Sequence, residues 1–170
     1  RKANSRFVFM STCMVYDTAS SQGAIAETHP TKAASPYAGA KLAGENMVQS
    51  YFHAYGLPTV ILRPFNTYGP YQKSTGEGGV VSIFIDKDLN KEPLKIYGDG
   101  TQTRDLMYVE DCAEFVVTAA MNERCTGEIL NAGLGEDITI NDLAALICND
   151  KKRIRRVKHI HPQSEIAKLL

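Results

Sequence analysis

The segment that most constrains the fold of this chain is "PTVILRP", residues 58–64. Its centre, Val60 to Leu62, is an uninterrupted apolar run, which is typical of a strand in a parallel sheet whose two faces are both covered. A second apolar run, "RFVFMS", ends near Ser11, and a helical pattern lies between the two runs. Because parallel neighbours need a long connection, this order predicts a βαβ crossover and an α/β fold.

The helical pattern between the two strands has clear ends. Ser35 is suited to the N-cap, Pro36 to the first helical position, and Gly56 to the C-terminal end. Apolar or small residues recur at helical spacing along it: Ala40, Ala43, Met47, Val48, Tyr51 and Phe52. Within this helix Tyr37 and Lys41 are four residues apart and therefore share a face. Alone, such a pair is ordinary on a solvated helix.

The remainder of the chain alternates further short strands and helices. We expect a glycine-rich loop over 66–79, helices over 80–90, 109–121 and 139–148, and strands within 94–97 and 127–133. The basic run "KKRIRRVKH" has apolar residues interleaved. It is interpreted as a surface strand or loop, close to an anionic ligand, and not as a nucleic-acid site.

Composition excludes several classes of protein. The 170 residues have a formal net charge of zero and are 44% hydrophobic and 22% charged, the profile of a soluble globular protein without a global attraction to nucleic acid or membrane. No apolar run is long enough to cross a bilayer. The cysteines are scattered without a CxxC pair (Cys13, Cys112, Cys125 and Cys148), which predicts reduced thiols in a cytoplasmic protein and no zinc site. His159 and His161 are likewise interpreted as non-metal residues.

Polar side chains are expected to meet at one edge of the sheet. Thr12 ends the first strand, Asn66 follows the second, and Tyr37 begins the connecting helix. Ligands of open α/β sheets bind outside the carboxyl ends of the strands. These three residues, with Lys41 beside them, are therefore the candidate site.

Four motifs in order then resemble a known family: "STCMVYD", "SPYAGAK", "LRPFNTYGPYQ" and "IYGDGTQTRDLMYVEDCAE". They resemble the extended short-chain dehydrogenase/reductases that act on nucleotide sugars, the NAD-dependent epimerase/dehydratase family, over nearly the whole chain. The resemblance implies a Rossmann-like parallel sheet with a small C-terminal substrate-binding lobe. Residues 1–70 would belong to the NAD-binding domain and 71–170 to the lobe, with about 108–133 packing back on the larger domain.

The resemblance also implies a chemistry for these residue types. Such enzymes oxidise the C4 hydroxyl of a sugar by hydride transfer to NAD. Tyr37 would be the general base and acid, and Lys41 would stabilise the phenolate and hold the nicotinamide ribose. Thr12 would hydrogen-bond the C4 oxygen. Ser11 and Pro64 would complete the cofactor contacts.

Further residues carry over from the family to the substrate side. Asn66 would contact the phosphates of the nucleotide sugar, and Arg104 would hold the diphosphate with its planar fork. Tyr97 would lie near the nucleotide base, or else is a packed strand residue. The family usually forms homodimers through the Tyr–Lys helix, so that Met47, Val48, Tyr51 and Phe52 would be interface residues instead of core.

The chain departs from the family pattern in two ways, and the first is that segments of the pattern are missing or replaced. The glycine fingerprint for the dinucleotide phosphates is missing, so the chain is expected to be the C-terminal portion of a longer protein and inactive in isolation. Near the end, "HPQSEI" replaces an "RPGD"-like stretch that would supply a phosphate contact.

The second departure concerns the reaction. Family 4,6-dehydratases have Asp-Glu directly after the threonine, whereas this chain has Cys13 and Met14. A 4-epimerase needs only the threonine, tyrosine and lysine, so 4-epimerisation is the first expectation. A dehydratase in which Cys13 transfers the proton is the alternative, against a thiol that simply packs under the strand. A decarboxylase and a non-catalytic sugar-nucleotide-binding relative are less favoured.

Overall fold

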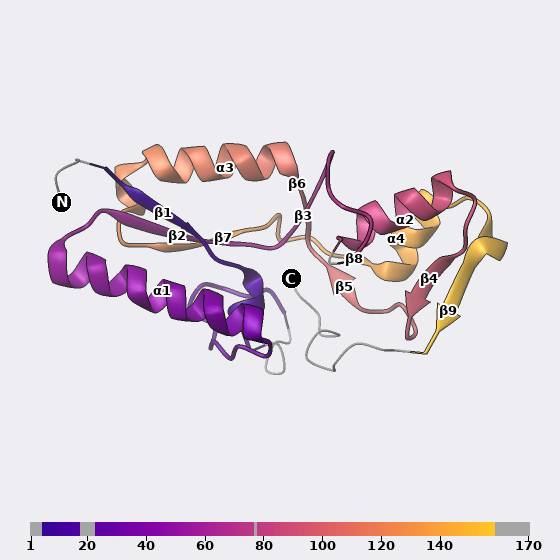
Figure 1. The fold of residues 1–170 in the computed structure, drawn as a ribbon, viewed down its shortest axis with the longest axis horizontal. Coiled ribbons are helices and arrows are strands. Elements are labelled where there is room, and N and C mark those ends of the chain that lie inside the picture. Colours follow the sequence, from indigo (N-terminus) through magenta and orange to yellow (C-terminus); the bar gives the residue numbers. More distant parts are fainter. Residues whose placement is uncertain (1–4, 18–22, 77, 159–170) are drawn as a thin grey trace.

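The structure, a computed structural model, describes residues 5–17, 23–76 and 78–158. Its elements form two groups side by side along the long axis of the molecule (Figure 1). One group contains a parallel sheet between two helices, and the other contains two helices beside short two-stranded sheets. His159, His161 and the "HPQSEI" stretch lie outside the described residues.

The first group is a three-stranded parallel sheet in the order β1-β2-β7. Its elements are β1 (Phe7–Met10), α1 (Pro36–Tyr55), β2 (Thr59–Pro64), α3 (Val109–Met121) and β7 (Ile129–Ala132). Val8 pairs with Val60 and Ile61 with Ile129. Helices α1 and α3 lie on opposite sides of the sheet (Figure 1). The predicted βαβ crossover is confirmed, and the apolar run of β2 is buried because both of its faces are covered.

Helix α1 begins and ends where its sequence predicts. The Ser35 side chain accepts a hydrogen bond from the Ala38 amide, Pro36 takes the first turn, and Gly56 ends the helix with a left-handed φ of 61°. The expected apolar stripe is only partly buried. Val48 is 8% exposed and belongs to the core, contrary to the expectation of an interface residue. Met47 and Tyr51 are 65% and 50% exposed and face away from the sheet.

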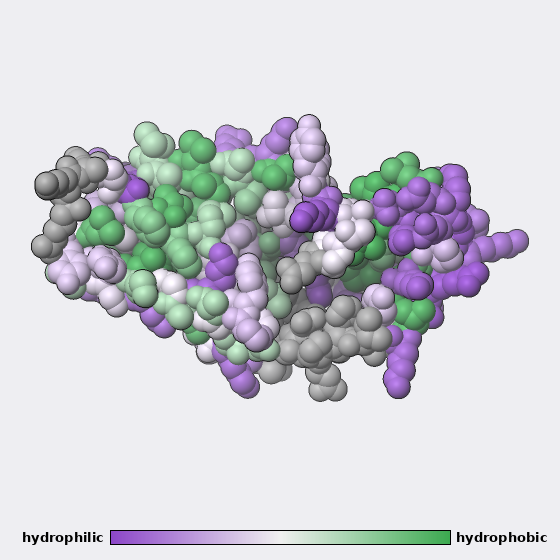
Figure 2. All heavy atoms as spheres, in the orientation of Figure 1, coloured by the Kyte–Doolittle hydropathy of each residue, from purple (hydrophilic) through white to green (hydrophobic). Residues whose placement is uncertain are grey.

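The second group packs two helices against a parallel strand pair. It contains α2 (Val80–Leu89), β4 (Leu94–Tyr97), α4 (Ile140–Ile147) and β9 (Ile154–Val157). Its buried core is Val81, Phe84, Leu94, Ile96, Ile140, Leu143, Ala144 and Cys148. The basic run becomes β9, in which Arg155 and Arg156 are exposed, so the prediction of a surface strand is confirmed. Hydrophilic side chains gather over this group (right in Figure 2).

Four short strands were not predicted from the sequence. Strand β3 (Asn66–Tyr68) pairs with β6 (Leu106–Tyr108), and β5 (Thr103–Arg104) pairs with β8 (Ile138–Thr139). Part of the predicted 66–79 loop is therefore a strand. Segments of two or three residues are too short to show a period of two, and their partners are distant in the sequence.

None of the helices in the described part of the chain is both long enough and apolar enough to cross a membrane. Within the same residues, His, Cys, Asp and Glu side chains nowhere gather in threes or more in a way that could hold a metal ion. All four cysteines are free thiols.

Two Gly→Ala substitutions should change stability in opposite directions. At Gly127, φ is +85° and a Cβ would lie 2.5 Å from Cζ of Phe52, so Gly127→Ala should lower the free energy of unfolding by about 1–3 kcal/mol. At Gly39, inside α1, a Cβ meets nothing within 4 Å, so Gly39→Ala should raise it by about 0.5–1 kcal/mol. Urea unfolding followed by circular dichroism measures both. Equal effects at the two positions would contradict this backbone argument.

Candidate active site

The carboxyl ends of β1 and β2 bring the first candidate residues to one edge of the sheet. Cys13, directly after Thr12, and Phe65, directly before Asn66, belong to the same buried cluster, together with Tyr16 and Ile25. Since their chain neighbours pack together, Thr12 and Asn66 lie at the same edge. The predicted convergence of strand ends is therefore present for these two residues.

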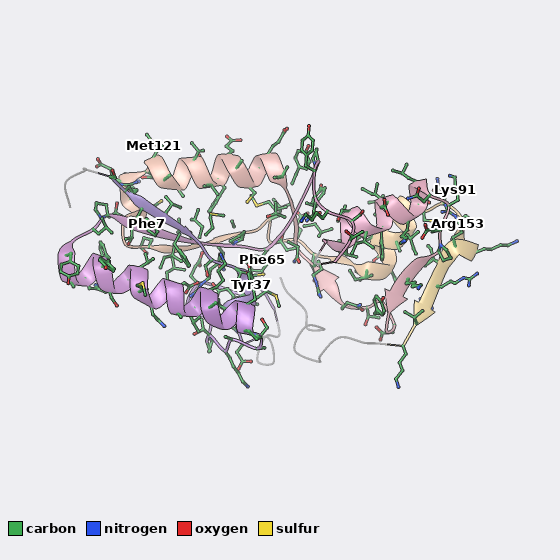
Figure 3. All side chains as sticks on the ribbon, viewed as in Figure 1. Phe7, Tyr37, Phe65, Lys91, Met121 and Arg153 are labelled. Atoms are coloured by element: carbon green, nitrogen blue, oxygen red, sulfur yellow. The ribbon has the colours of Figure 1, made fainter. Side chains whose placement is uncertain are left out.

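Tyr37 and Lys41 stand beside this edge, on the first turns of α1. The Lys41 Nζ lies 5.8 Å from the centroid of the Tyr37 ring and donates a 2.7 Å hydrogen bond to the Met10 carbonyl oxygen at the end of β1. Tyr37 is 57% exposed and lies at the end of α1 nearest the middle of the molecule (Figure 3). A phenol open to a ligand and an ammonium anchored to the strand end are thus neighbours.

Thr12 is almost buried, and its hydroxyl is oriented by the backbone. Its Oγ1 accepts a hydrogen bond of 3.2 Å from the Met14 amide, at the start of the short 3₁₀ helix η1 (Cys13–Val15). A hydroxyl that accepts in this way still has its own proton to donate. Thr12 can therefore donate to an oxygen held at the strand end.

Cys13 is 3% exposed and packs in the buried cluster. Burial raises the pKa of its thiol to about 12, although the positive charge of Arg104 acts in the opposite direction. The thiol is therefore neutral near pH 7. Met14 has no ionisable group, so the two positions after Thr12 supply no readily exchanged proton.

Asn66 begins β3 and Arg104 ends β5, two short strands that belong to different two-stranded sheets. The Asn66 amide N–H donates to the Asp105 carbonyl oxygen at 3.1 Å, and Arg104 is close enough to Cys13 to affect its thiol electrostatically. The side-chain Nδ2 of Asn66 is buried and has no hydrogen-bond partner among the described residues. An unsatisfied buried donor costs free energy. A ligand that accepts a hydrogen bond from this Nδ2 would remove that cost, so Asn66 is suited to ligand binding.

Tyr97 lies at the end of β4, in the second group of elements. Its carbonyl oxygen accepts a hydrogen bond of 3.0 Å from Gln102 Nε2, which closes the turn after β4. Its ring is half-buried. The hydrogen bond from Gln102 connects Tyr97 to the turn after β4.

Of the two other expected cofactor contacts, Ser11 already has a hydrogen-bond partner in the protein. Its side chain is 3% exposed, and its hydroxyl donates to the Glu45 carboxylate, so that only the acceptor sites of this oxygen remain for a cofactor. Pro64 ends β2 opposite Ala132 of β7 and is half-buried at the same edge.

Sequence reasoning missed a buried ion pair beneath the site. Glu45 of α1 is 1% exposed and Arg63 of β2 is 3% exposed. The Arg63 Nε and Nη2 atoms donate to the two carboxylate oxygens of Glu45 at 2.9 and 2.6 Å. Burial opposes the charge of Arg63, but its hydrogen bonds to Glu45 and Tyr16 outweigh this and raise its pKa. A charged residue within the apolar run of β2 was the signal that could have revealed the pair.

Asp105 is a second buried carboxylate that the sequence did not reveal. It is 1% exposed and accepts hydrogen bonds from the amides of Leu134 and Gly135 at 3.1 and 2.8 Å. These amides follow β7, the third strand of the sheet. Asp105 therefore fixes the loop at the carboxyl end of β7, beside the backbone that holds Asn66.

Comparison with known proteins identifies the family of the chain. The family model described as "NAD dependent epimerase/dehydratase family" matches residues 1–133. A putative UDP-glucose 4-epimerase of Methanocaldococcus jannaschii is 43% identical over 121 residues, which are 71% of this chain and 39% of that protein. A dTDP-glucose 4,6-dehydratase of Xanthomonas campestris pv. campestris is 35% identical over 148 residues, 87% of this chain and 41% of that protein.

Solved structures agree with this assignment. Pal from Bacillus thuringiensis has a TM-score of 0.92 at 62% identity, over 98% of this chain and 53% of Pal. The UDP-glucose 4-epimerase of Thermotoga maritima, solved with UDP-glucose, has a TM-score of 0.88 at 32% identity, over 97% of this chain and 53% of that one. A dTDP-glucose 4,6-dehydratase of Bacillus anthracis, solved with NAD, has a TM-score of 0.83 at 28% identity, over 91% of this chain and 50% of that one.

The chain thus spans about two fifths of these curated relatives and about half of these solved chains. Its parallel strands form a Rossmann-like sheet, as the four motifs led us to expect. Both epimerases and dehydratases are among the relatives, so the match establishes the family and not the reaction. On its motifs, its fold and this family match, the chain belongs to the NAD-dependent epimerase/dehydratase family.

Proposed function

We propose that this chain is the C-terminal portion of an NAD-dependent nucleotide-sugar 4-epimerase, which oxidises the C4 hydroxyl of a nucleotide hexose transiently. The observation that carries the proposal is the pair formed by the exposed Tyr37 phenol and the Lys41 ammonium, which is anchored to Met10 at the end of β1. A phenol beside an ammonium at the strand ends is suited to moving a proton.

Each residue of the site has a defined task in this proposal. Tyr37 takes the proton of the C4 hydroxyl and later returns one, and Lys41 stabilises the phenolate by its charge. Thr12 donates a hydrogen bond to the C4 oxygen. Bound NAD would accept the hydride of the sugar and give it back. An ammonium has three donors, so Lys41 can hold Met10 and the ribose of the cofactor together. Pro64, at the end of β2, would complete the cofactor contacts.

The substrate side of the site accounts for the remaining polar residues. The unpartnered Asn66 Nδ2 would donate to a phosphate oxygen, and the Arg104 guanidinium would bind the diphosphate as a planar fork. Tyr97 would contact the nucleotide base from the second lobe. The relative from Thermotoga maritima was solved with UDP-glucose, which supports a nucleotide sugar as the class of substrate.

Epimerisation is preferred over elimination because the residues after Thr12 transfer protons poorly. Loss of water requires an acid at C6 and a base at C5, whereas burial raises the pKa of the Cys13 thiol to about 12 and Met14 has no acidic proton. A 4-epimerase needs neither, since the keto-sugar can turn and accept hydride on its other face. The site therefore suffices for inversion at C4.

A dehydratase is the second candidate, and one structural observation favours it. The charge of Arg104 acts on the Cys13 thiol in the direction that eases its ionisation. In this alternative, Cys13 would be the proton-transferring group of the elimination.

The incomplete sheet supports the proposal of a longer enzyme. Strand β1 is at the edge of the sheet, and its Phe7 and Met10 side chains are 48% and 38% exposed. An edge strand leaves backbone groups unpaired, so we propose that further strands of an NAD-binding domain pair with β1 and that their connecting helices cover Phe7 and Met10. Residues 1–70 and about 108–133 would then belong to that domain and the remainder to the substrate lobe. The isolated chain would be inactive.

We also propose a homodimer through α1. Its outward residues Met47, Tyr51 and Tyr55 are 65%, 50% and 58% exposed. Such large apolar and aromatic side chains on one helix are typical of an interface. A second copy of α1 would cover them.

Replacing the proposed base should remove turnover but not binding. In the full-length protein, Tyr37→Phe should lower kcat by about 10²–10⁴-fold with little change in KM, because it removes only the group that transfers the proton. Tyr51→Phe, at an exposed tyrosine on the same helix, is the matched control and should retain activity. Steady-state kinetics measure both, and a Tyr37→Phe enzyme with normal kcat would refute the proposed role.

Replacing Cys13 separates the two candidate reactions. If Cys13 only packs, Cys13→Ala should leave kcat within about threefold and lower the free energy of unfolding by about 1 kcal/mol, as for other small losses of buried volume. If Cys13 transfers a proton, kcat should fall by about 10²-fold or more. The first result supports the epimerase, and the second supports the dehydratase.

The reaction itself can be identified by isotope incorporation. The full-length protein is incubated with NAD and a panel of nucleotide hexoses in deuterated water, and the products are analysed by NMR and mass spectrometry. A product inverted at C4 without deuterium at C5 is expected. Loss of water with deuterium at C5 or C6 would identify a dehydratase instead, and binding without any turnover would identify a non-catalytic relative.

A further inference from the structure

Glu45, which pairs with Arg63 of β2, lies on the same side of helix α1 as the proposed proton-transfer residues. Tyr37, Lys41 and Glu45 are spaced by four residues each, so they follow one another along one side of α1. At about 1.5 Å of rise per residue, Glu45 is about 6 Å from Lys41 and about 12 Å from Tyr37 along the helix axis. Contacts that fix the position of Glu45 therefore also fix the positions of Lys41 and Tyr37, which precede it on the same side of the helix.

Glu45 connects α1 to the carboxyl ends of two strands at once. Its Oε1 accepts from the Arg63 Nε at the end of β2 and from the Ser11 hydroxyl just after β1, and its Oε2 accepts from the Arg63 Nη2. The N–H groups of a guanidinium donate to the two oxygens of a carboxylate in one planar orientation. This geometry fixes both the position of α1 along its axis and its rotation about that axis.

Arg63 is in turn held by its own surroundings. Its guanidinium carbon lies 4.6 Å from the centroid of the Tyr16 ring, and its Nη1 donates to the Glu27 carbonyl oxygen at 3.4 Å. The Tyr16 hydroxyl donates to the Asn131 Oδ1 at 2.6 Å, and Asn131 is the neighbour of Arg63 across the sheet. The ion pair is thus a rigid connection between α1 and the whole parallel sheet.

We propose that Glu45 and Arg63 are positioning residues, which hold α1 at the height and rotation that place Tyr37 and Lys41 at the strand ends. This inference rests on the proposed function, because it gives the pair a role in the reaction assigned to Tyr37 and Lys41. Neither residue of the pair contacts the substrate; both act through the helix.

A contribution to folding stability alone does not explain a buried Glu45–Arg63 ion pair beneath the candidate site. A buried ion pair can often be replaced by apolar residues of similar size without loss of stability, because desolvation offsets the attraction between the charges. Apolar contacts lack direction, however, and would let α1 slide or turn slightly. A misplacement of about 1 Å can lower a rate by about 10²-fold, so a directional contact under the proton-transfer pair has a functional consequence.

The test uses two variants of the full-length protein. Glu45→Gln keeps the shape but leaves the Arg63 charge buried without a counter-ion, and should lower both Tm and kcat. The double variant Glu45→Met/Arg63→Met removes both charges and should recover most of the Tm. Its kcat should nevertheless remain about 10–100-fold below that of the unsubstituted protein, with KM within about threefold, because the reacting groups and not the binding groups are displaced.

A control from the same strand separates position from stability. Val60 is 0% exposed and packs on the α3 side of β2, with Ala119, away from the Glu45 side. Val60→Ala should lower Tm while leaving kcat within about twofold. If kcat follows Tm in all the variants, or if the double variant has normal kcat, the pair is only structural and the inference is overturned.

Hydrogen exchange tests the inference separately from the proposed function. In the double variant, amides of residues 38–45 should exchange about tenfold faster than in the unsubstituted protein at equal Tm, whereas β2 amides should not, since only α1 loses its directional contact. Unchanged exchange in α1 would overturn the positioning role even if the unsubstituted protein is an epimerase. Failure of the unsubstituted protein to convert any nucleotide hexose would overturn the proposed function, while the exchange result would still decide whether the pair positions α1.

Discussion

The ion pair between Glu45 and Arg63 is the interaction on which the arrangement of the site depends. Both charges are removed from water, which is costly unless every donor and acceptor is matched. The match is made by the fork of Arg63 on the carboxylate, by the Ser11 hydroxyl, and by the Tyr16 ring against the guanidinium. These contacts join α1 to the ends of β1 and β2, where the candidate catalytic residues stand.

Around this ion pair, some polar side chains are accessible to a ligand and others are buried in the core. Tyr37 is exposed, and Lys41 reaches back to the strand end through Met10. Cys13 is buried, and burial raises the pKa of its thiol to about 12. At the same edge of the sheet, the phenol of Tyr37 and the ammonium of Lys41 are therefore accessible to a ligand, whereas the thiol of Cys13 is buried. Our proposal of inversion at C4 instead of elimination rests on that contrast, and not on the presence of the residues alone.

Much of the fold was predictable because its signals are local. The caps at Ser35 and Gly56 and the apolar run of β2 each depend on a few neighbouring residues, and the structure confirms them. The short strands β3, β5, β6 and β8 were missed, because two or three residues show no period and their pairing depends on distant partners. On α1, the expectation of an interface residue instead of core was wrong for Val48, which is buried, whereas Met47 and Tyr51 face outward.

The sequence by itself determined the family, the βαβ order and the identity of Tyr37, Lys41 and Thr12 as candidates, because motif order and spacing are properties of the chain. Only the tertiary structure decided that the Ser11 hydroxyl donates to Glu45 and that Cys13 is buried. It also decided that the side-chain Nδ2 of Asn66 has no hydrogen-bond partner in the described part of the chain. Desolvation and hydrogen-bond satisfaction depend on which distant segments enclose a side chain, and that enclosure exists only after strands and helices have packed.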